Sequence, residues 1–466
     1  MSIVNRIVKL IVWFFVAIVV LLAIGYIVLF TINFHDQPPS SAAKRLAQLS
    51  SSRTQVEDDY NGYVYLLGFS AKQGVEPQEQ GKKYIQWAQK TVSESAASII
   101  EEFPDRNSDF KVQKSKLIRE LLQQCRTIDS ACLYLLEHNQ DSILHWIESN
   151  RWLMERYQTL IRYHEWAEIV PYDTRLPLPE YSAVFDAQSL LFTEAWLVAA
   201  EGDAEKVKTL LTRDVGFWRE VLGSSDILIT KMIAVAALKR HFSWSNLVLR
   251  ALPNEVVSES LPESWQLPIT ESERSMLRCM TGEWVFSKSM LERAKLDFNN
   301  EYIFPEQYSS ISSISWILLR PLLKTQDSSN QLAEAILAFD ETLNQPYSSY
   351  PHAVEQATSV WLSELRRPFP GRAYNLVGDL LLSVSDWNPA QYAVRVTDLE
   401  GVRRLALVAA ELRAWSLTPQ KIEGALKETE LRNPYNGEPF LWNEASESIE
   451  FHGLEEGERG QHSILY

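Results

Sequence analysis

Residues 195–222 read AWLVAAEGDAEKVKTLLTRDVGFWREVL and show how this 466-residue chain is built. Gly202 can end one helix here, and Asp203 can cap the next one with its side chain. After this break, apolar residues recur at intervals of three and four, so they share one face of a helix. These residues are Val207, Leu210, Leu211, Trp218, Val221 and Leu222. The stretch therefore predicts two antiparallel helices joined by a tight turn.

Helical patterns of this kind extend through most of the chain. Residues 195–222 resemble a tetratricopeptide-type helix pair, but no second copy follows at a fixed period of about 34 residues. We therefore predict a mainly α-helical body of irregular, α-solenoid-like helix pairs. Its predicted parts are a helical domain at 59–252, a proline-rich loop or boundary at 253–269, and a helical domain at 270–431 that can be continuous with the first.

The C-terminal end, residues 432–466, has a different pattern. An Asn-Gly dipeptide at 436–437 is typical of a turn. The aromatic stretch 440–442 can pair with residues 449–451, so we predict a small β-hairpin. The residues after this hairpin are rich in glutamate, and we expect this acidic tail to fray.

The run Leu10–Phe34, LIVWFFVAIVVLLAIGYIVLFTINF, contains no charged side chain. At a rise of about 1.5 Å per residue it makes about 37 Å of helix, more than the ~30 Å hydrocarbon core of a bilayer. The hydrophobic region of a cleaved signal peptide is shorter, at ~7–15 residues. We therefore predict that residues 1–34 form a cytoplasmic stub and an uncleaved transmembrane signal anchor. The alternative is a buried core helix.

Charges that flank this span predict its orientation. Arg6 and Lys9 precede it, whereas His35 and Asp36 follow it. The positive-inside rule then places the N-terminus in the cytoplasm. In a bacterium with two membranes, the body would lie in the periplasm and be attached to the inner membrane by a single pass. Residues 35–58 are rich in proline, serine and charge, and they predict a linker between membrane and body.

The overall charge argues against some classes of partner. The chain has 60 acidic and 45 basic residues and a formal net charge of −15. Such a protein is a poor ligand for nucleic acid and for anionic lipid surfaces. The chain has 17 glycines, and this low number argues against nucleotide-binding folds that depend on glycine-rich loops.

Two of the three cysteines are seven residues apart, at Cys125 and Cys132. In one continuous helix they would stand about 10.5 Å apart along the axis, whereas a disulfide needs α-carbons closer than ~7 Å. Asp129 or Ser130 can cap a new helix between them, and this break would permit a disulfide in an oxidising periplasm. The alternative is a pair of buried free thiols. We expect Cys279 to be a buried apolar residue.

Motifs of common enzymes are missing from the sequence. It has no Gly-x-Ser-x-Gly elbow, no Walker loop and no Gly-x-Gly-x-x-Gly before a helix. His138 and His145 can share a helix face, but no third ligand is near them in sequence. The stretch His164-Glu165-x-x-Glu168 lacks the second histidine of a zinc protease. We therefore predict no catalytic residue, no metal ligand and no cofactor, and an enzymatic activity is less expected than its absence.

One basic loop is a candidate binding surface in this acidic chain. Arg366, Arg367 and Arg372 lie in the stretch RRPFPGR. Three guanidinium groups can hold a carboxylate, a phosphate or a partner protein. The alternative is a solvated loop whose arginines form salt bridges with neighbouring helices.

Several residues near the C-terminus follow the order Asx-Pro, glycine, aromatic strand: Asn433, Pro434, Gly437, Pro439, Phe440 and Trp442. This order resembles a segment near the end of pseudopilins. The whole chain is similar to membrane-anchored helical proteins of the proteobacterial envelope. The entry motif NGYVYLLGF at 61–69, the paired cysteines and the Asn-Pro tail carry that similarity. The resemblance implies an architecture and a location, and it implies no activity.

These features together favour a structural, interaction or chaperone-like role in the cell envelope. The expected partners are the inner membrane and an envelope protein, and the sequence does not indicate an oligomeric state. The alternative is a periplasmic enzyme that acts on peptidoglycan or another glycan without a recognisable motif. Such an enzyme would need a cleft with two carboxylates ~5–10 Å apart.

Overall fold

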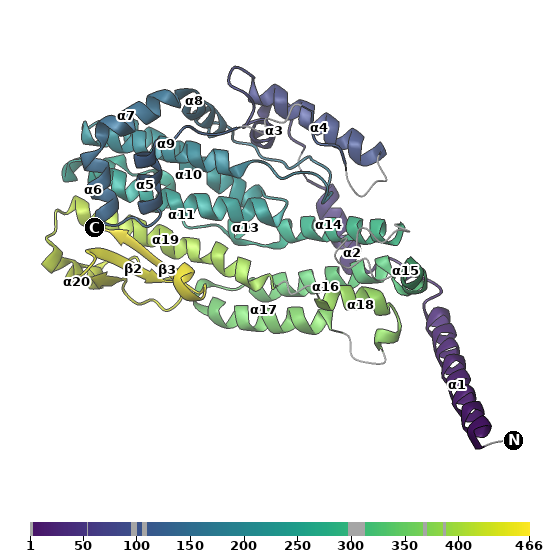
Figure 1. Ribbon diagram of the computed structural model, residues 1–466. Coiled ribbons are helices and arrows are strands. Elements are labelled where there is room, and N and C mark those ends of the chain that lie inside the picture. Colours follow the sequence, from purple (N-terminus) through teal and green to yellow (C-terminus); the bar gives the residue numbers. More distant parts are fainter. Residues whose placement is uncertain are drawn as a thin grey trace. The chain divides into compact units, whose positions relative to one another are not determined.

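The computed structural model describes residues 3–53, 55–94, 100–104, 110–296, 313–366, 371–384 and 388–466. The chain is mostly helical, with an apolar N-terminal helix and a small C-terminal antiparallel sheet (Figure 1). The predicted fold class is therefore confirmed.

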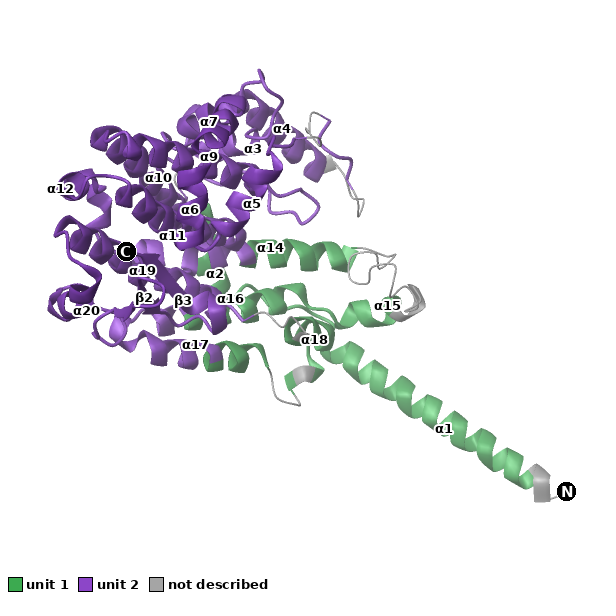
Figure 2. Ribbon diagram, turned by 60° about the vertical axis from the view of Figure 1, so that its left-hand side comes forward, with its two compact units in different colours: residues 1–51, 284–339, 359–387 green, residues 52–283, 340–358, 388–466 purple. Residues whose placement is uncertain are grey.

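Two compact units are present, and each is assembled from segments that are separated in the sequence (Figure 2). Unit 1 consists of residues 1–51, 284–339 and 359–387. Unit 2 consists of residues 52–283, 340–358 and 388–466. The helices that run from one unit into the other are α14 (Leu277–Leu296), α16 (Thr325–Leu343) and α17 (Tyr350–Leu365).

Unit 1 contains the N-terminal helix. This helix is α1 (Ile3–Ile32), and the other elements that lie wholly within the unit are α2 (Ser41–Ser51), α15 (Ser313–Leu319), α18 (Leu376–Val384) and the 3₁₀ turns η5 (Arg320–Leu322) and η7 (Gly371–Ala373). Within α1, the 27-residue segment Arg6–Ile32 is long and apolar enough to cross a membrane, and among the described residues it is the one helix that meets this test.

The predicted linker at 35–58 contains helix α2. Ser40 accepts a hydrogen bond from the backbone N–H of Ala43 at its hydroxyl oxygen (3.2 Å) and so caps the helix. Ala42, Ala43 and Leu46 form a short apolar stripe that is buried. The proline and serine residues around this stripe make the stretch read as a linker, although its small apolar face is enough to pack α2.

The other helical elements belong to unit 2. They are η1 (Asp58–Tyr60), α3 (Gly62–Leu67), α4 (Pro77–Glu94), α5 (Lys116–Gln124), α6 (Ser130–His138), α7 (Gln140–Ser149), α8 (Arg151–Leu160), α9 (Tyr181–Ala200), α10 (Ala204–Ser224), α11 (Leu228–Arg250), α12 (Asn254–Val257), η2 (Ser258–Ser260), η3 (Glu263–Trp265), α13 (Glu271–Arg274), η6 (Tyr347–Ser349), α19 (Ala390–Ala414), α20 (Pro419–Glu428) and η8 (Gly457–Gly460). Helix α11 packs against α9, α10 and α19 in the centre of the unit (Figure 1).

The helix pair predicted at 195–222 is α9 and α10. Gly202 lies between them with a φ of 85°, a left-handed value that glycine adopts at little cost. The side chain of Asp203 accepts a hydrogen bond from the backbone N–H of Lys206 at 3.0 Å and caps α10. All six apolar residues of the predicted face are buried. The turn, the cap and the buried face are therefore confirmed.

The stretch 253–269, predicted as a loop or boundary, lies inside unit 2. Arg219 of α10 holds it by donating hydrogen bonds to the carbonyl oxygens of Ser264 (2.7 Å), Leu267 (2.9 Å) and Pro268 (2.8 Å). Charge-assisted bonds of this kind are stronger than neutral ones. The stretch is therefore fixed against the helical core of its unit.

The sheet at the C-terminus has three antiparallel strands in the order β1 (Leu441–Asn443), β2 (Ser448–His452) and β3 (Gln461–Leu465). Trp442 pairs with Ile449, which confirms the predicted hairpin. The expectation of a frayed tail is wrong, because β3 pairs with β2 along its whole length. Its last residues, Ile464 and Leu465, are buried, and this apolar ending outweighs the effect of the glutamates before it.

Candidate functional site

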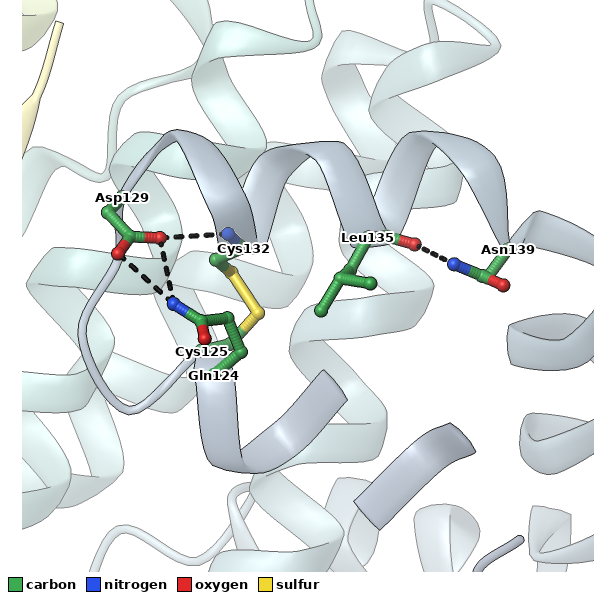
Figure 3. Close-up of a disulfide and its surroundings, with 6 residues drawn as sticks. All are labelled: Gln124, Cys125, Asp129, Cys132, Leu135 and Asn139. Carbon is green, nitrogen blue, oxygen red and sulfur yellow. Dashed lines mark hydrogen bonds between the residues drawn. A yellow bond between two sulfur atoms is a disulfide. The ribbon is translucent and has the colours of Figure 1, made fainter. Parts of the chain in front are cut away.

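A disulfide joins Cys125 and Cys132, whose α-carbons lie 4.9 Å apart (Figure 3). Helix α5 ends at Gln124, just before the first cysteine. The carboxylate of Asp129 accepts a hydrogen bond from the backbone N–H of Cys132 at 2.8 Å and begins α6. Gln124 donates to the same carboxylate at 3.2 Å. The chain thus breaks at the predicted cap, and the disulfide ties α5 to α6.

The third cysteine, Cys279, is buried in α14 and unbonded. Burial raises the pKa of its thiol to about 12, so the reactive thiolate is scarce at neutral pH. The described residues include no group of three or more His, Cys, Asp or Glu that could hold a metal ion.

The candidate anion loop is described only in part. Arg366 follows the end of α17 and is exposed. Arg367 and the side chain of Arg372 lie outside the described residues. The three arginines therefore remain a prediction.

A buried histidine network lies at the centre of unit 2. His241 of α11 donates from Nδ1 to the carboxylate of Asp214 in α10 at 2.8 Å. The indole N–H of Trp265 donates to Nε2 of the same imidazole at 3.0 Å, which assigns the ring proton to Nδ1. Asp214 also accepts the phenolic O–H of Tyr157. The side chains of His241 and Asp214 are fully buried.

This network looks like a catalytic triad because Ser245 follows one turn after His241. Its hydroxyl oxygen is 3.5 Å from Nε2, at the limit of a hydrogen bond, and Nε2 already accepts from Trp265. Ser245 is fully buried, so a substrate cannot reach it. The network therefore holds α10, α11 and η3 together, and it is not a nucleophile with its base.

A groove with a volume of about 860 Å³ lies on unit 2. It runs along α17, the first turns of α19 and the segment 454–459. Its apolar lining comes from Val354, Ala390, Val394 and Leu454. Three exposed carboxylates, Glu355, Glu456 and Glu458, line it together with Arg459. We call this the C-terminal groove.

Asp398 of α19 fixes the tail that forms one side of this groove. Its carboxylate accepts the backbone N–H groups of Leu454 (2.9 Å) and Glu455 (3.2 Å) and the phenolic O–H of Tyr435 (2.6 Å). Burial by itself would raise the pKa of Asp398, but the imidazole of His462, whose Nε2 lies 4.0 Å away, and the hydrogen bonds from Tyr435 and these N–H groups hold it below its usual value. The acidic tail is thus held by a buried carboxylate.

Glu455 is the half-buried carboxylate of the C-terminal groove. Arg395 Nε lies 2.7 Å from one of its oxygens, and Lys239 Nζ lies 3.6 Å from the other. Burial lowers the pKa of Lys239, and the nearby carboxylates of Asp398 and Glu455 partly offset that effect. Glu455 is therefore committed to two ion pairs, which leaves it poorly placed to act as a catalytic acid or base.

The end of α1 is built into the rest of unit 1. The buried side chain of Asn33 donates from Nδ2 to the carbonyl oxygens of Leu29 and Ala373, both at 2.8 Å. Its Oδ1 accepts the backbone N–H of Asn375 at 2.7 Å. Every polar atom of this amide group is used. The helix therefore leads into the body at a fixed point.

The apolar side of α1 also contributes to the core of unit 1. Tyr26 and Leu29 pack against a buried cluster that joins four segments of the unit: Leu291, Trp316, Leu322, Leu323 and Val377. The hydroxyl group of Tyr26 donates to the carbonyl oxygen of Leu318 at 3.0 Å.

The residues after α1 are fixed as well. The carboxylate of Asp36 accepts the backbone N–H groups of Gln326 and Asp327, both at 3.1 Å, at the beginning of α16. An acidic group at this position accepts hydrogen bonds from N–H groups that have no partner within the helix, and its negative charge interacts favourably with the positive end of the helix dipole. Asn330 donates to the carbonyl oxygen of Pro38 and accepts the N–H of Ser40, both at 2.9 Å.

The sequence by itself did not indicate either arrangement. The C-terminal groove combines α17, α19 and the tail. The contacts that Tyr26, Leu29, Asn33 and Asp36 form within unit 1, which we call the seat of α1, join residues about 300 positions apart in the chain. One weak signal existed for the seat, because Asn33 is a polar residue at the end of a long apolar run. No local pattern points to its partners.

Comparisons with protein-family models, with curated proteins and with solved structures found no match to this chain. The fold and the geometry alone define its class. It is a mostly helical protein whose N-terminal helix is long and apolar enough to span a membrane and whose body incorporates the end of that helix.

Proposed function

We propose that this protein is a single-pass inner-membrane protein whose helical body lies in the periplasm and binds another envelope protein. The seat of α1 carries the first part of this proposal. A cleaved signal sequence would take away Tyr26, Leu29 and Asn33, and it would leave the buried cluster and the N–H of Asn375 without partners. The seat therefore favours an uncleaved transmembrane helix.

Two observations support the orientation. Arg6 and Lys9 precede the apolar segment of α1, as the positive-inside rule expects for a cytoplasmic N-terminus. The disulfide between Cys125 and Cys132 suits the oxidising periplasm better than the reducing cytoplasm.

The C-terminal groove supports the interaction role. It has an apolar lining for side chains of a partner and three exposed carboxylates for its charges. Arg459 offsets one of these charges, so the exposed groups leave an excess of negative charge. The partner that fits is a polypeptide segment with apolar residues and lysine or arginine, bound as a structural or client segment.

The glycan-enzyme alternative has less support among the described residues. Glu455, the most buried carboxylate of the groove, is held by Arg395 and Lys239. The histidine network of unit 2 is closed to substrate.

Site-specific labelling in cells tests the orientation. Leu441→Cys places a thiol on an exposed strand position of unit 2, and Asn5→Cys places one in the N-terminal stub. A membrane-impermeant maleimide, applied after the outer membrane is permeabilised, should label the variant at position 441 at once. The variant at position 5 should stay unlabelled until the inner membrane is disrupted. The opposite pattern would contradict the proposed topology.

Photo-crosslinking in intact cells tests the partner. A photoreactive amino acid replaces the exposed Glu355 in the groove or, as a control, the exposed Glu205 in α10. We expect one defined protein adduct from position 355 that is absent from position 205 and weakened by Glu458→Lys. Equal adducts at both positions, or no adduct at position 355, would contradict binding in the groove.

A further inference from the structure

Several large apolar side chains of unit 1 are exposed outside α1. Ile317 and Leu318 of α15 are 61 % and 49 % exposed, and Leu380 of α18 is 59 % exposed. Leu376, four residues before Leu380 on α18, is 38 % exposed, and Leu296 at the end of α14 is 73 % exposed. We call these five residues the apolar tip.

Two of the three helices of the tip, α15 and α18, are apolar on both sides. Helix α15 contains no charged residue, and the one charged residue of α18, Asp379, is buried. Trp316 and Val377 belong to the buried cluster, whereas Ile317 and Leu380 are exposed. A helix on the surface of a soluble protein usually has a polar outer face, so this pattern indicates a different environment.

The tip lies beside the last turns of the membrane-spanning segment, on the side of α1 that contains Tyr26 and Leu29. Tyr26 and Leu29 of α1 pack against the buried cluster that holds α14, α15 and α18 together. Tyr26 donates a hydrogen bond to the carbonyl oxygen of Leu318 within the tip. It precedes Ile32, the end of the apolar segment, by six residues, which is roughly 9 Å of helix. If α1 spans the bilayer, the tip lies at the depth of the outer-leaflet interface.

The charge of unit 1 permits this contact. Unit 1 has 12 basic and 10 acidic residues, whereas unit 2 has 33 basic and 50 acidic residues. The acidic surplus of the chain, which argues against anionic surfaces, therefore belongs to unit 2. Lys295 directly precedes the tip residue Leu296, and its Nζ lies 3.8 Å from the carboxylate of Asp36. Arg320 follows the tip residue Leu318 by two positions. Long cationic side chains at such positions can reach lipid headgroups.

We propose that the apolar tip is embedded in the periplasmic leaflet of the membrane, so that the body is held at the bilayer by a lipid-facing surface in addition to α1. The occupant of this surface is lipid, because the tip continues the lipid-facing surface of α1 itself. This inference rests on the proposed transmembrane role of α1. A body held in this way cannot swing freely on a tether, since α1 and the tip contact the bilayer together.

Spin labelling of the full-length protein in vesicles of phosphatidylcholine and phosphatidylglycerol tests the inference. Single cysteines replace Ile317 and Leu380 in the tip, Val28 in α1, and Leu267 of unit 2, which is 60 % exposed and serves as the matched control. The native cysteines do not interfere, since two are bonded and the third is buried. Each nitroxide is exposed to oxygen, which concentrates in lipid, and to a nickel chelate, which stays in water.

We expect the oxygen-to-nickel collision ratio at positions 317 and 380 to exceed that at 267 several-fold and to approach that at 28. A lipid-like ratio at 28 with water-like ratios at 317 and 380 would overturn the embedded tip and leave the anchor intact. A water-like ratio at 28 would overturn the transmembrane role and the tip together. Positions 317 and 380 shielded from both reagents would indicate a protein cover and would also overturn the proposal.

Discussion

The side-chain oxygen of Asn33, one residue beyond α1, accepts a hydrogen bond from the backbone N–H of Asn375, 342 residues away in the chain. Asn375 has a left-handed φ of 58°, which asparagine tolerates better than most residues. Its own side chain accepts the N–H of Lys324 and donates to Ser328. The end of α1 is thus joined by hydrogen bonds to a buried polar cluster of unit 1.

Replacing Asn33 should weaken unit 1. Asn33→Ala removes three hydrogen bonds and leaves two backbone groups, the partly buried Ala373 C=O and the buried Asn375 N–H, without this partner. We expect a loss of about 2–3 kcal/mol in the free energy of unfolding, measured by thermal denaturation of the detergent-solubilised protein.

The matched control for that variant is Asn139→Ala. Asn139 donates to the carbonyl oxygen four residues earlier, Leu135 (Figure 3), as Asn33 does to Leu29, but in the described structure its side chain forms no hydrogen bond to a distant element. Equal effects of the two substitutions would contradict the role assigned to Asn33.

The disulfide should be measurable by counting thiols. We expect one reactive thiol per denatured chain without reductant and three after reduction, because Cys279 is free and the other two cysteines are bonded. Reduction should cost about 2 kcal/mol of stability, since the closed loop is short. A Cys125→Ser, Cys132→Ser double variant should no longer respond to reductant, whereas Cys279→Ser should respond as the wild type does.

Glu168 should make stability depend on pH. Its carboxylate accepts the N–H groups of Asp226 and Ile227 at the beginning of α11, and burial raises its pKa to about 8. The folded state therefore keeps a proton that the unfolded state loses above the ordinary glutamate pKa of about 4.3. The unfolded state binds fewer protons in this window, so stability falls as pH rises from about 5 to 8, by up to about 1.4 kcal/mol per pH unit.

The variant Glu168→Gln keeps an acceptor oxygen and cannot ionise. We expect it to match the wild type within about 1–2 kcal/mol at pH 5 and to become relatively more stable as pH approaches 8. Glu205→Gln makes the same chemical substitution at an exposed position of α10 and should leave the pH profile of the wild type unchanged. Parallel profiles of wild type and Glu168→Gln would show that Glu168 is ionised in the folded protein.

Asp398 should hold the C-terminal tail. Asp398→Asn replaces one acceptor oxygen by an amide donor that faces the N–H groups of Leu454 and Glu455. We expect faster hydrogen exchange in β3 and the segment before it, and a loss of about 2–4 kcal/mol in stability. Because the pKa of Asp398 is lowered in the folded state, its contribution is complete above the ordinary aspartate pKa and is lost as pH falls through the lowered value.

Exchange in α5 and α6 serves as the internal reference for this variant, since the disulfide holds these helices independently of the tail. Asp203→Asn, which keeps a good helix cap at an exposed position, should leave exchange in the tail unchanged. Uniform acceleration across unit 2 would mean that Asp398 stabilises the whole unit and does not hold the tail specifically.

The local pattern of residues was sufficient for much of the fold. The face from Val207 to Leu222, the cap at Asp203 and the helix break at Asp129 were all predictable. So was the apolar segment at the N-terminus. Each depends on a helical period, a cap or a run of apolar residues within about 30 positions, and these are properties that a short segment has on its own.

Tertiary structure alone decided the rest. The seat of α1, the C-terminal groove and the pairing of β3 each join segments whose own sequences contain no pattern that points to the partner segment. Asn33 matters because Asn375 lies beside it, and the tail is ordered because Asp398 accepts its N–H groups. Hydrogen bonds and apolar contacts of this kind act between atoms that are close in space whatever their distance along the chain, so they become visible only when the segments have been brought together.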